Sequence, residues 1–207
     1  MAADHPADRP NPVTLLRRET AFQGHYRVDR YRVRHALYDG GEGKPISREV
    51  FERGHGVCVL PYDPARDRVV LIEQFRIAPY VVGERAWLVE AIAGVIDPGE
   101  TPAAVARREA LEEAGLELGT LEPIARYYVS PGGTSETLTL FCAPGPLPDG
   151  VGGVHGLEAE GEDIRVLAIP FTEAMAMVAD GRIVAGPAIV ALQWLALNRA
   201  RLRGASG

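Results

Sequence analysis

Three glutamates in the middle of the chain have the spacing of a metal-binding helix face. Glu109, Glu112 and Glu113 are three and four positions apart, which on an α-helix places their side chains on one face. Like charges at this spacing repel one another, and a hard divalent cation removes that repulsion. Because no His or Cys lies in this segment, the oxygen ligands favour Mg²⁺ or Mn²⁺ over zinc. The alternative interpretation is an acidic helix face exposed to solvent.

The residues around these glutamates predict the helix that carries them. Thr101 supplies a capping hydroxyl, and Pro102 is favoured in the first turn of a helix. Residues 102–114 are strong helix formers, and Gly115 is a natural stop. In the preceding loop, 94–99, two glycines and a proline allow backbone carbonyls to turn toward the same ion. A neighbouring stripe of small side chains suits close packing on a sheet: Ala103, Ala106, Ala110 and Ala114.

The composition indicates an ordinary soluble globular protein. Its 207 residues, 46% hydrophobic and 24% charged, are enough for a sizeable core. The net charge of −6 argues against non-specific binding of nucleic acid, which needs a basic surface. Cys58 and Cys142 lie in apolar runs without a CxxC motif, so we expect reduced core residues of a cytoplasmic protein. With no leader pattern and no apolar run of membrane length, we expect neither export nor contact with a membrane.

The chain divides into three regions by pattern. Residues 1–12 are rich in proline and charge and are predicted to be disordered. Residues 13–53 form a small N-terminal antiparallel β-sheet subdomain, with strands expected near 13–20, 26–36 and 48–53. Three strands are hardly stable alone, so this sheet must pack on the main domain or on a second subunit. Residues 54–207 form the main domain.

The main domain alternates strands with one central helix and ends in helices. We expect a hairpin of 56–62 with 68–75 and a single strand over 87–93. Further strands are expected at 124–129, 137–142 and 164–169. The glycine-rich stretch from Pro144 to Gly161 is predicted to be a long mobile loop. A short helix between Thr172 and Gly181 and a longer one from Pro187 complete the domain. This order indicates an α+β fold, built as an α/β/α sandwich.

The segment from Gly94 to Leu116, GVIDPGETPAAVARREALEEAGL, resembles the signature of the Nudix hydrolases in every defining position. From about Arg18 onward the chain resembles the ADP-ribose pyrophosphatase branch of that family. The segments that carry this likeness are SREVFERGH (47–55), LIEQFR (71–76), SPGGTSE (130–136), HGLEAEGEDIRV (155–166) and IVALQWL (189–195). The resemblance implies a Nudix sandwich with a mixed sheet, and hydrolysis of ADP-ribose to AMP and ribose 5-phosphate. It also implies a homodimer that exchanges N-terminal strands, with both subunits binding the substrate.

The resemblance also assigns the catalytic machinery. It implies an Mg²⁺ site, open to Mn²⁺, formed by the carbonyl of Ala93 and by Glu109, Glu112, Glu113 and Glu162. Glu100 and Arg108 would form a supporting ion pair that orients the helix. Glu160 would be the catalytic base. The flanking Ala159 and Gly161 favour Glu160 over Glu162 for that role, because small neighbours leave the carboxylate free to reach water.

The remaining assignments concern the substrate. The resemblance implies contacts from His25, Tyr26, Arg48, Arg76, Val95, Ser130, Pro131, Gly132 and Glu136. Pro131 follows Leu116 by fifteen residues, the position that marks ADP-ribose specificity in this branch. Arg48 and Arg76 would meet phosphate or ribose oxygens. Tyr26 would stack on adenine, whereas His25 replaces an expected aromatic.

Other interpretations remain open at this point. The same chemistry on another nucleoside diphosphate sugar, such as GDP-mannose, is the nearest alternative. A non-catalytic Nudix module that senses nucleotides is a different class, but its usual marks, a decayed motif and an attached DNA-binding region, are absent from this sequence. The acids at 158–163 could simply solubilise a loop. The lone histidines, among them His155, show no ligand spacing and are assigned only packing or hydrogen bonding.

Overall fold

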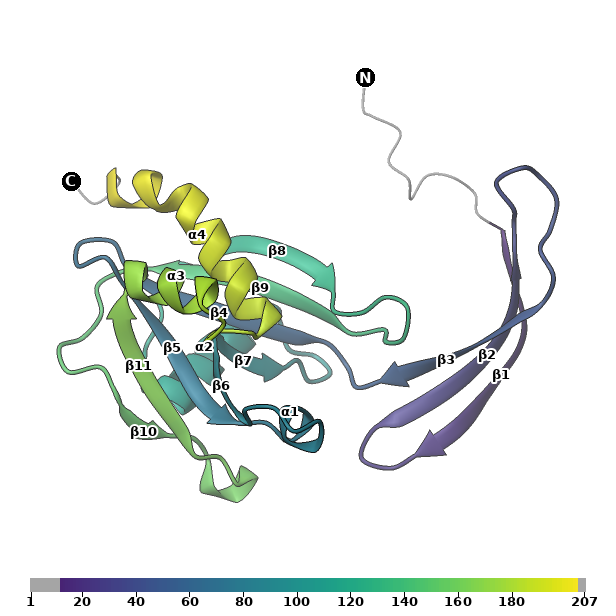
Figure 1. The fold of residues 1–207 in the computed structure, drawn as a ribbon, viewed down its shortest axis with the longest axis horizontal. Coiled ribbons are helices and arrows are strands. Elements are labelled where there is room, and N and C mark those ends of the chain that lie inside the picture. Colours follow the sequence, from purple (N-terminus) through teal and green to yellow (C-terminus); the bar gives the residue numbers. More distant parts are fainter. Residues whose placement is uncertain (1–11, 205–207) are drawn as a thin grey trace. The chain divides into compact units, whose positions relative to one another are not determined.

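The computed structural model describes residues 12–204, which form two compact units (Figure 1). Within the described residues, unit 1 comprises 12–54 together with Tyr128–Glu136, and unit 2 comprises His55–Tyr127 and 137–204. Each unit is described by itself. The prediction of disorder for residues 1–12 falls, except for residue 12, outside the described residues. The sequence pattern places Tyr128–Glu136 in the main domain, whereas the structure groups this segment with unit 1.

Unit 1 is a three-stranded antiparallel sheet in the order β1-β2-β3. Its strands are β1 (Val13–Gln23), β2 (Arg27–His35) and β3 (Ile46–Glu52), close to the predicted positions. Among its described residues no hydrophobic side chain is buried, and only Asp29 and Glu136 are. The Asp29 carboxylate accepts hydrogen bonds from Arg18 (2.7 Å), Thr20 (2.9 Å) and Arg27 (3.1 Å). This sheet is therefore held by ladder hydrogen bonds and polar contacts rather than by a core of its own.

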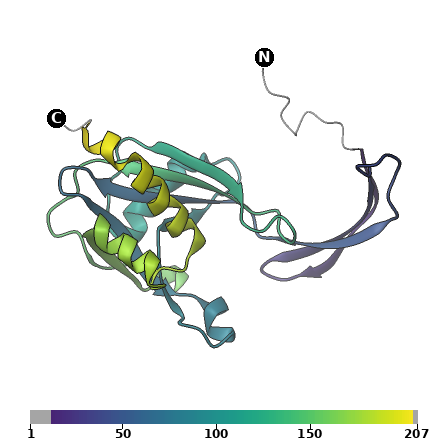
Figure 2. The same ribbon diagram turned by 45° about the horizontal axis from the view of Figure 1, so that its top comes forward.

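Unit 2 contains one mixed sheet whose main path runs β10-β11-β5-β4-β9-β8, with β6 paired to β5 and β7 to β4 (Figures 1 and 2). The strands are β4 (Gly56–Asp63), β5 (Arg68–Phe75), β6 (Trp87–Glu90), β7 (Ile92–Val95), β8 (Glu122–Tyr128), β9 (Thr137–Pro144), β10 (Gly153–His155) and β11 (Ile164–Pro170). The helices are α1 (Ile77–Val81), α2 (Pro102–Ala114), α3 (Phe171–Ala179) and α4 (Gly186–Gly204). In the described part of the chain no helix is long and apolar enough to cross a membrane.

The central strand β4 is buried on both faces, and its alternating side chains divide the core. Val57 and Val59 belong to the cluster that includes α2, whereas Leu60 and Tyr62 belong to the cluster that includes α3 and α4. The sheet thus has α2 on one face and the two C-terminal helices on the other, which confirms the predicted α+β sandwich. Cys58 and Cys142 are both buried in the cluster that includes α3 and α4.

Two local predictions are wrong. The expected single strand over 87–93 is two strands, because β6 pairs with β5 while β7 pairs with β4. The expected mobile loop from Pro144 to Gly161 contains β10, which pairs antiparallel with β11, and a 3₁₀ turn over Glu158–Glu160. The edge of β11 exposes backbone hydrogen-bonding groups, and pairing satisfies them. Glycine content alone does not reveal that pairing.

Candidate active site

The helix α2 begins and ends where its sequence predicts. The Thr101 hydroxyl accepts a hydrogen bond from the Ala104 N–H at 3.2 Å, and Pro102 follows at the first helical position. Gly115 closes the helix with a φ of 63°, in the left-handed region that favours glycine. Its buried face, Val105, Ala106, Ala110, Glu113 and Ala114, packs on the sheet. Of the predicted stripe of small side chains, Ala106, Ala110 and Ala114 serve that packing, whereas Ala103 is only partly buried.

Close packing also brings α2 against strand β7. A Cβ added to Gly94 would lie 1.8 Å from Oε1 of Glu109, so only glycine leaves room for that carboxylate. Glu113 is 3% exposed, and its Oε2 accepts a hydrogen bond from the Ala93 N–H at 3.0 Å. The first glycine of the signature thus provides the space in which the helix carboxylates meet the strand.

Two of these carboxylates are held in an environment that disfavours their charge. The pKa of Glu113 is raised to about 8, mainly by burial; the Ala93 hydrogen bond opposes the rise, and the charges of Glu109 and Glu162 add to it. Burial likewise raises the pKa of Glu109 to about 7; Arg108 opposes this rise, and Glu112 and Glu162 add to it. Glu162, forty-nine positions after Glu113, is therefore close enough to both for its charge to act on them.

Arg108 is the cation that these acids share. Its guanidinium lies 2.9 Å from Oε1 of Glu109, 2.9 Å from Oε2 of Glu112 and 3.5 Å from Oε1 of Glu100. The expected contact between Glu100 and Arg108 is thus present. The carboxylates of Glu109 and Glu112 are turned toward Arg108. Among the described residues, no group of three or more His, Cys, Asp or Glu side chains is arranged as a metal site.

The donor set nevertheless fits a hard divalent cation. Glu109 and Glu113 are oxygen donors, and burial raises the pKa of both, so a bound cation would offset the cost of their negative charge. Because Gly94 has no side chain, the Glu109 carboxylate can lie directly against strand β7. Rotation of Glu109 and Glu112 away from Arg108 would free both for an ion.

A cavity of about 300 Å³ opens beside this cluster. Its lining residues are Gln74, Phe75, Arg76, Trp87, Gly161, Glu162 and Asp163. Arg76 donates to Oε2 of Glu90 from Nε (3.0 Å) and Nη2 (2.7 Å). Burial lowers the pKa of Arg76, but the Glu90 hydrogen bond and the charges of Glu113 and Glu162 outweigh it, so the net shift is upward. The cavity thus places a permanent cation next to the acids.

The predicted base, Glu160, and one predicted substrate contact, Val95, complete the predicted residues of unit 2. The backbone of Glu160 lies in the 3₁₀ turn, and its side chain falls outside the described part of the structure. Val95 ends β7 opposite Gly56 and is 48% exposed. Unit 2 therefore brings together Ala93, Glu100, Arg108, Glu109, Glu112, Glu113, Glu162 and Arg76.

The other predicted substrate residues lie in unit 1: His25, Tyr26, Arg48, Ser130, Pro131, Gly132 and Glu136. The Tyr26 ring contacts Phe51 edge-on at 5.1 Å between centroids, and the Arg53 guanidinium lies 5.6 Å above it. Arg53 is also 3.6 Å from Glu136. Sequence reasoning missed Phe51 and Arg53, although both lie in the conspicuous segment 47–55.

The remaining unit 1 residues have local partners. Arg48 donates to the Ser47 carbonyl at 2.8 Å, and His25 packs edge-on against Tyr26 at 4.5 Å between ring centroids. The Ser130 carbonyl accepts from the N–H groups of Gly133 and Thr134, both at 3.0 Å, which forms a tight turn around Pro131 and Gly132. Pro131 is accordingly exposed at a turn, as Pro-Gly-Gly predicts.

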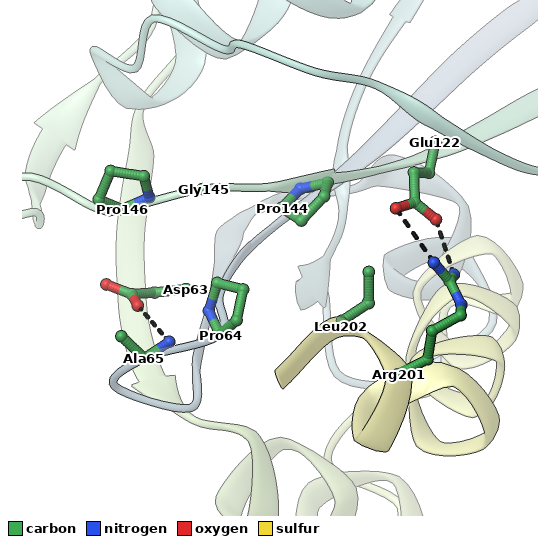
Figure 3. Close-up of a pocket in the computed structure, with 9 residues that line it drawn as sticks. All are labelled: Asp63, Pro64, Ala65, Glu122, Pro144, Gly145, Pro146, Arg201 and Leu202. Atoms are coloured by element: carbon green, nitrogen blue, oxygen red, sulfur yellow. Dashed lines mark hydrogen bonds and ion pairs between the residues drawn. The ribbon is translucent and has the colours of Figure 1, made fainter. Parts of the chain in front are cut away.

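A second cavity, of about 310 Å³, lies at the carboxyl ends of β4 and β9 (Figure 3). Its walls include Pro64, Pro144, Pro146 and Leu202. The polar groups that line it are already paired: Glu122 with Arg201 at 2.7 Å, and Asp63 with the Ala65 N–H at 3.0 Å. Gly94 approaches β4 at its opposite end, where Gly56 begins the strand. This cavity therefore shows no unpaired group that would take part in chemistry.

A mixed sheet between helix layers, with an acidic helix packed on a glycine of the adjoining strand, defines the class of Nudix hydrolases. Comparison with known proteins agrees. The model of the NUDIX domain matches residues 52–205, and the chain belongs to that family. The "ADP-ribose pyrophosphatase" of Escherichia coli (strain K12) is 44% identical over 193 residues, covering 93% of this chain and 92% of that protein.

Two further comparisons bear on substrate and fold. The "GDP-mannose pyrophosphatase" of Pectobacterium atrosepticum is 39% identical over 186 residues, 88% of this chain and 93% of that protein. A crystal structure titled "ADP compounds hydrolase" superposes with a TM-score of 0.69 at 21% identity, covering 92% of this chain and 96% of that one. At that identity the structural likeness supports the fold alone.

Proposed function

We propose that this protein hydrolyses the pyrophosphate bond of ADP-ribose to AMP and ribose 5-phosphate, with Mg²⁺ as the working ion and Mn²⁺ as a substitute. The observation that carries the proposal is a pair of carboxylates on α2, buried Glu113 and half-buried Glu109, within an intact Nudix signature. The substrate follows from the extensive likeness to a protein named for ADP-ribose, and from Pro131 at the position that marks this branch.

The residues divide the work between binding charge and moving a proton. Glu109, Glu112, Glu113 and Glu162, with the carbonyl of Ala93, are the groups that would hold the cation. A bound divalent ion neutralises charge on phosphate oxygens and lowers the pKa of water. Arg76 holds phosphate oxygens in place, and Arg108 with Glu100 keeps the α2 carboxylates oriented. Glu160 takes the proton from the attacking water.

Unit 1 supplies the recognition of the nucleoside and the terminal ribose. Tyr26, supported by Phe51, offers an aromatic surface for adenine, with His25 beside it. Arg48 adds a substrate contact, and the Ser130–Pro131–Gly132 turn and Glu136 line the terminal ribose. Val95, in unit 2, adds a further substrate contact. Because unit 1 buries no apolar side chain among its described residues, we propose that a second copy of the chain covers it. Val13, Leu15 and Phe22, 58–61% exposed on β1, are the surface for that homodimer.

The second candidate function is hydrolysis of GDP-mannose, favoured by the relative that carries that name. The two substrates differ in the base and in the sugar, so a direct comparison separates them. We place either reaction in the cytoplasm, in keeping with two cysteines that lie in the core and form no CxxC motif.

The experiment is a substrate panel with the purified chain and Mg²⁺, read as AMP or GMP released from ADP-ribose, ADP-glucose, GDP-mannose and a dinucleoside polyphosphate. We expect kcat/KM for ADP-ribose to exceed the others by about tenfold or more, roughly 1.4 kcal/mol of transition-state discrimination. Comparable release of GMP would favour the second candidate. No release from any substrate would favour a nucleotide-sensing module.

A further inference from the structure

The C-terminal end of α2 is joined to the strand that leads into the acidic loop. The Gly156 N–H, just after β10, donates to the Glu112 carbonyl at 3.3 Å. The last four carbonyls of a helix have no partner within it, and Glu112 supplies one of these. The segment 153–156 therefore caps the helix that carries the carboxylates.

His155 fills the space beside that contact. A Cβ added to Gly115 would lie 3.0 Å from Cε1 of His155 and 3.5 Å from its Nδ1. On the other side, Nε2 of His155 is 3.0 Å from the Gly152 carbonyl. The ring is half-buried between the end of α2 and the backbone that enters β10. Gly115 thus serves two needs, a left-handed φ and the absence of a side chain where the imidazole lies.

The loop that follows is closed on itself around Glu162. The Leu157 N–H donates to Oε2 of Glu162 at 3.1 Å, and the Glu162 N–H donates to the Leu157 carbonyl at 3.2 Å. Gly156 has a φ of 104°, and a Cβ there would lie 2.7 Å from Cβ of Glu162. Residues 156–162 therefore behave as one small unit that joins the helix at 155–156.

We propose that His155 is a positioning residue: wedged between Gly115 and Gly152, it fixes the loop of Glu160 and Glu162 on the helix of Glu109 and Glu113. The anchoring is a property of the fold, and its effect on turnover rests on the proposed function. His155 is not among the residues that line the cavity, and its ring lies against the backbone at Gly115 and Gly152, so its effect on the acids passes through the backbone that it holds.

The first test compares His155→Ala with Val154→Ala. Val154 is the preceding residue of the same short strand and is 68% exposed. Its replacement by alanine also truncates a side chain of β10, but it leaves the contact of His155 with Gly115 in place. Hydrogen exchange should be faster at the Gly156 and Leu157 amides in His155→Ala and unchanged in Val154→Ala. Unchanged exchange at both amides in His155→Ala would overturn the proposal.

The second test reads turnover. Displacing a residue that orients ligands typically costs about 10- to 100-fold in affinity or activity. In His155→Ala we expect kcat for ADP-ribose to fall by about that factor and the Mg²⁺ concentration for half-maximal rate to rise, while KM stays near that of the wild type. A merely structural role would lower the melting temperature and the active fraction without moving the metal dependence, and that result contradicts the proposal.

A double-mutant cycle with Gly115→Asn tests the contact, because asparagine adopts the left-handed φ of this position more readily than other non-glycine residues. The added Cβ would lie 3.0 Å from Cε1 of the imidazole, so kcat should fall in Gly115→Asn and fall no further in the double variant with His155→Ala. Independent, multiplying losses would contradict a shared contact. If the wild type hydrolyses no ADP-ribose, the proposed function fails while hydrogen exchange still decides the anchoring.

Discussion

Replacing Glu113 with glutamine should inactivate the enzyme and, without metal, make the fold more stable. Glutamine has nearly the same shape, and its amide oxygen still accepts the Ala93 N–H, but it carries no charge to be buried. Glu113 has a pKa of about 8 in the fold against 4.5 as a free side chain. Between those values the folded state keeps a proton that the unfolded state releases, so wild-type stability falls as pH rises.

The size of the effect follows from that gap. At pH 7 the pH is roughly 2.5 units above the pKa of Glu113 in the unfolded chain, whereas the side chain in the folded protein is still mostly protonated. Each of these units lowers the free energy of unfolding by about 1.4 kcal/mol. The free energy of unfolding of the wild type is therefore about 3 kcal/mol lower at pH 7 than at acid pH. The loss begins near pH 4.5 and stops growing above about pH 8. Glu113→Gln avoids it.

The assay is urea unfolding in EDTA at pH 5, 7 and 8.5, for the wild type, Glu113→Gln and Glu117→Gln. The last variant makes the same chemical change at an exposed position just beyond α2. The stability advantage of Glu113→Gln should grow with pH, and Glu117→Gln should show none. An advantage that is independent of pH, or a Glu113→Gln variant less stable than wild type at pH 7, would refute the reasoning. With Mg²⁺, hydrolysis of ADP-ribose by Glu113→Gln should be almost lost.

Three other results are expected. Glu160→Gln should lower kcat by about 10²- to 10⁴-fold at all Mg²⁺ concentrations, whereas Glu162→Gln should be partly rescued by more Mg²⁺; metal titrations showing the reverse would exchange the two roles. Gly94→Ala should disrupt the site, since its Cβ would lie 1.8 Å from the Glu109 carboxylate, and activity with a near-normal Mg²⁺ requirement would contradict this. Asp67→Asn should cost about 1–3 kcal/mol at pH 7 in urea unfolding; the Arg199 hydrogen bond holds the pKa of Asp67 below 3.8, so the difference from wild type should disappear as pH falls below that value.

The helix and its acids could be predicted because their signals are local. Capping by Thr101, the stop at Gly115 and the spacing of Glu109 and Glu113 each involve neighbours within a few residues. Helix periodicity alone then determines which side chains share a face. The same holds for the strands of unit 1, which lie close to where their alternating polarity predicts them, and for β4, which the apolar run 56–62 predicts.

Pairing between distant segments was not readable in this way. The split of 87–93 into β6 and β7 arises because β6 pairs with β5 and β7 pairs with β4. The hydrophobic pattern of residues 87–93 does not indicate which strand each half pairs with. The short strand β10 was hidden among glycines for the same reason. Membership of Tyr128–Glu136 in unit 1 likewise rests on contacts such as the Phe51 N–H to the Gly133 carbonyl at 2.8 Å.

By itself the sequence determined the family, the chemistry of the donor set and the helix that presents it, because these depend on residue types at short, regular spacing. Tertiary structure alone decided that Glu113 is buried, that Glu162 lies near enough to raise its pKa, and that His155 rests on Gly115, forty positions earlier. Burial and long-range proximity arise when separate elements pack together. They depend on the whole sheet and its helices rather than on any one segment.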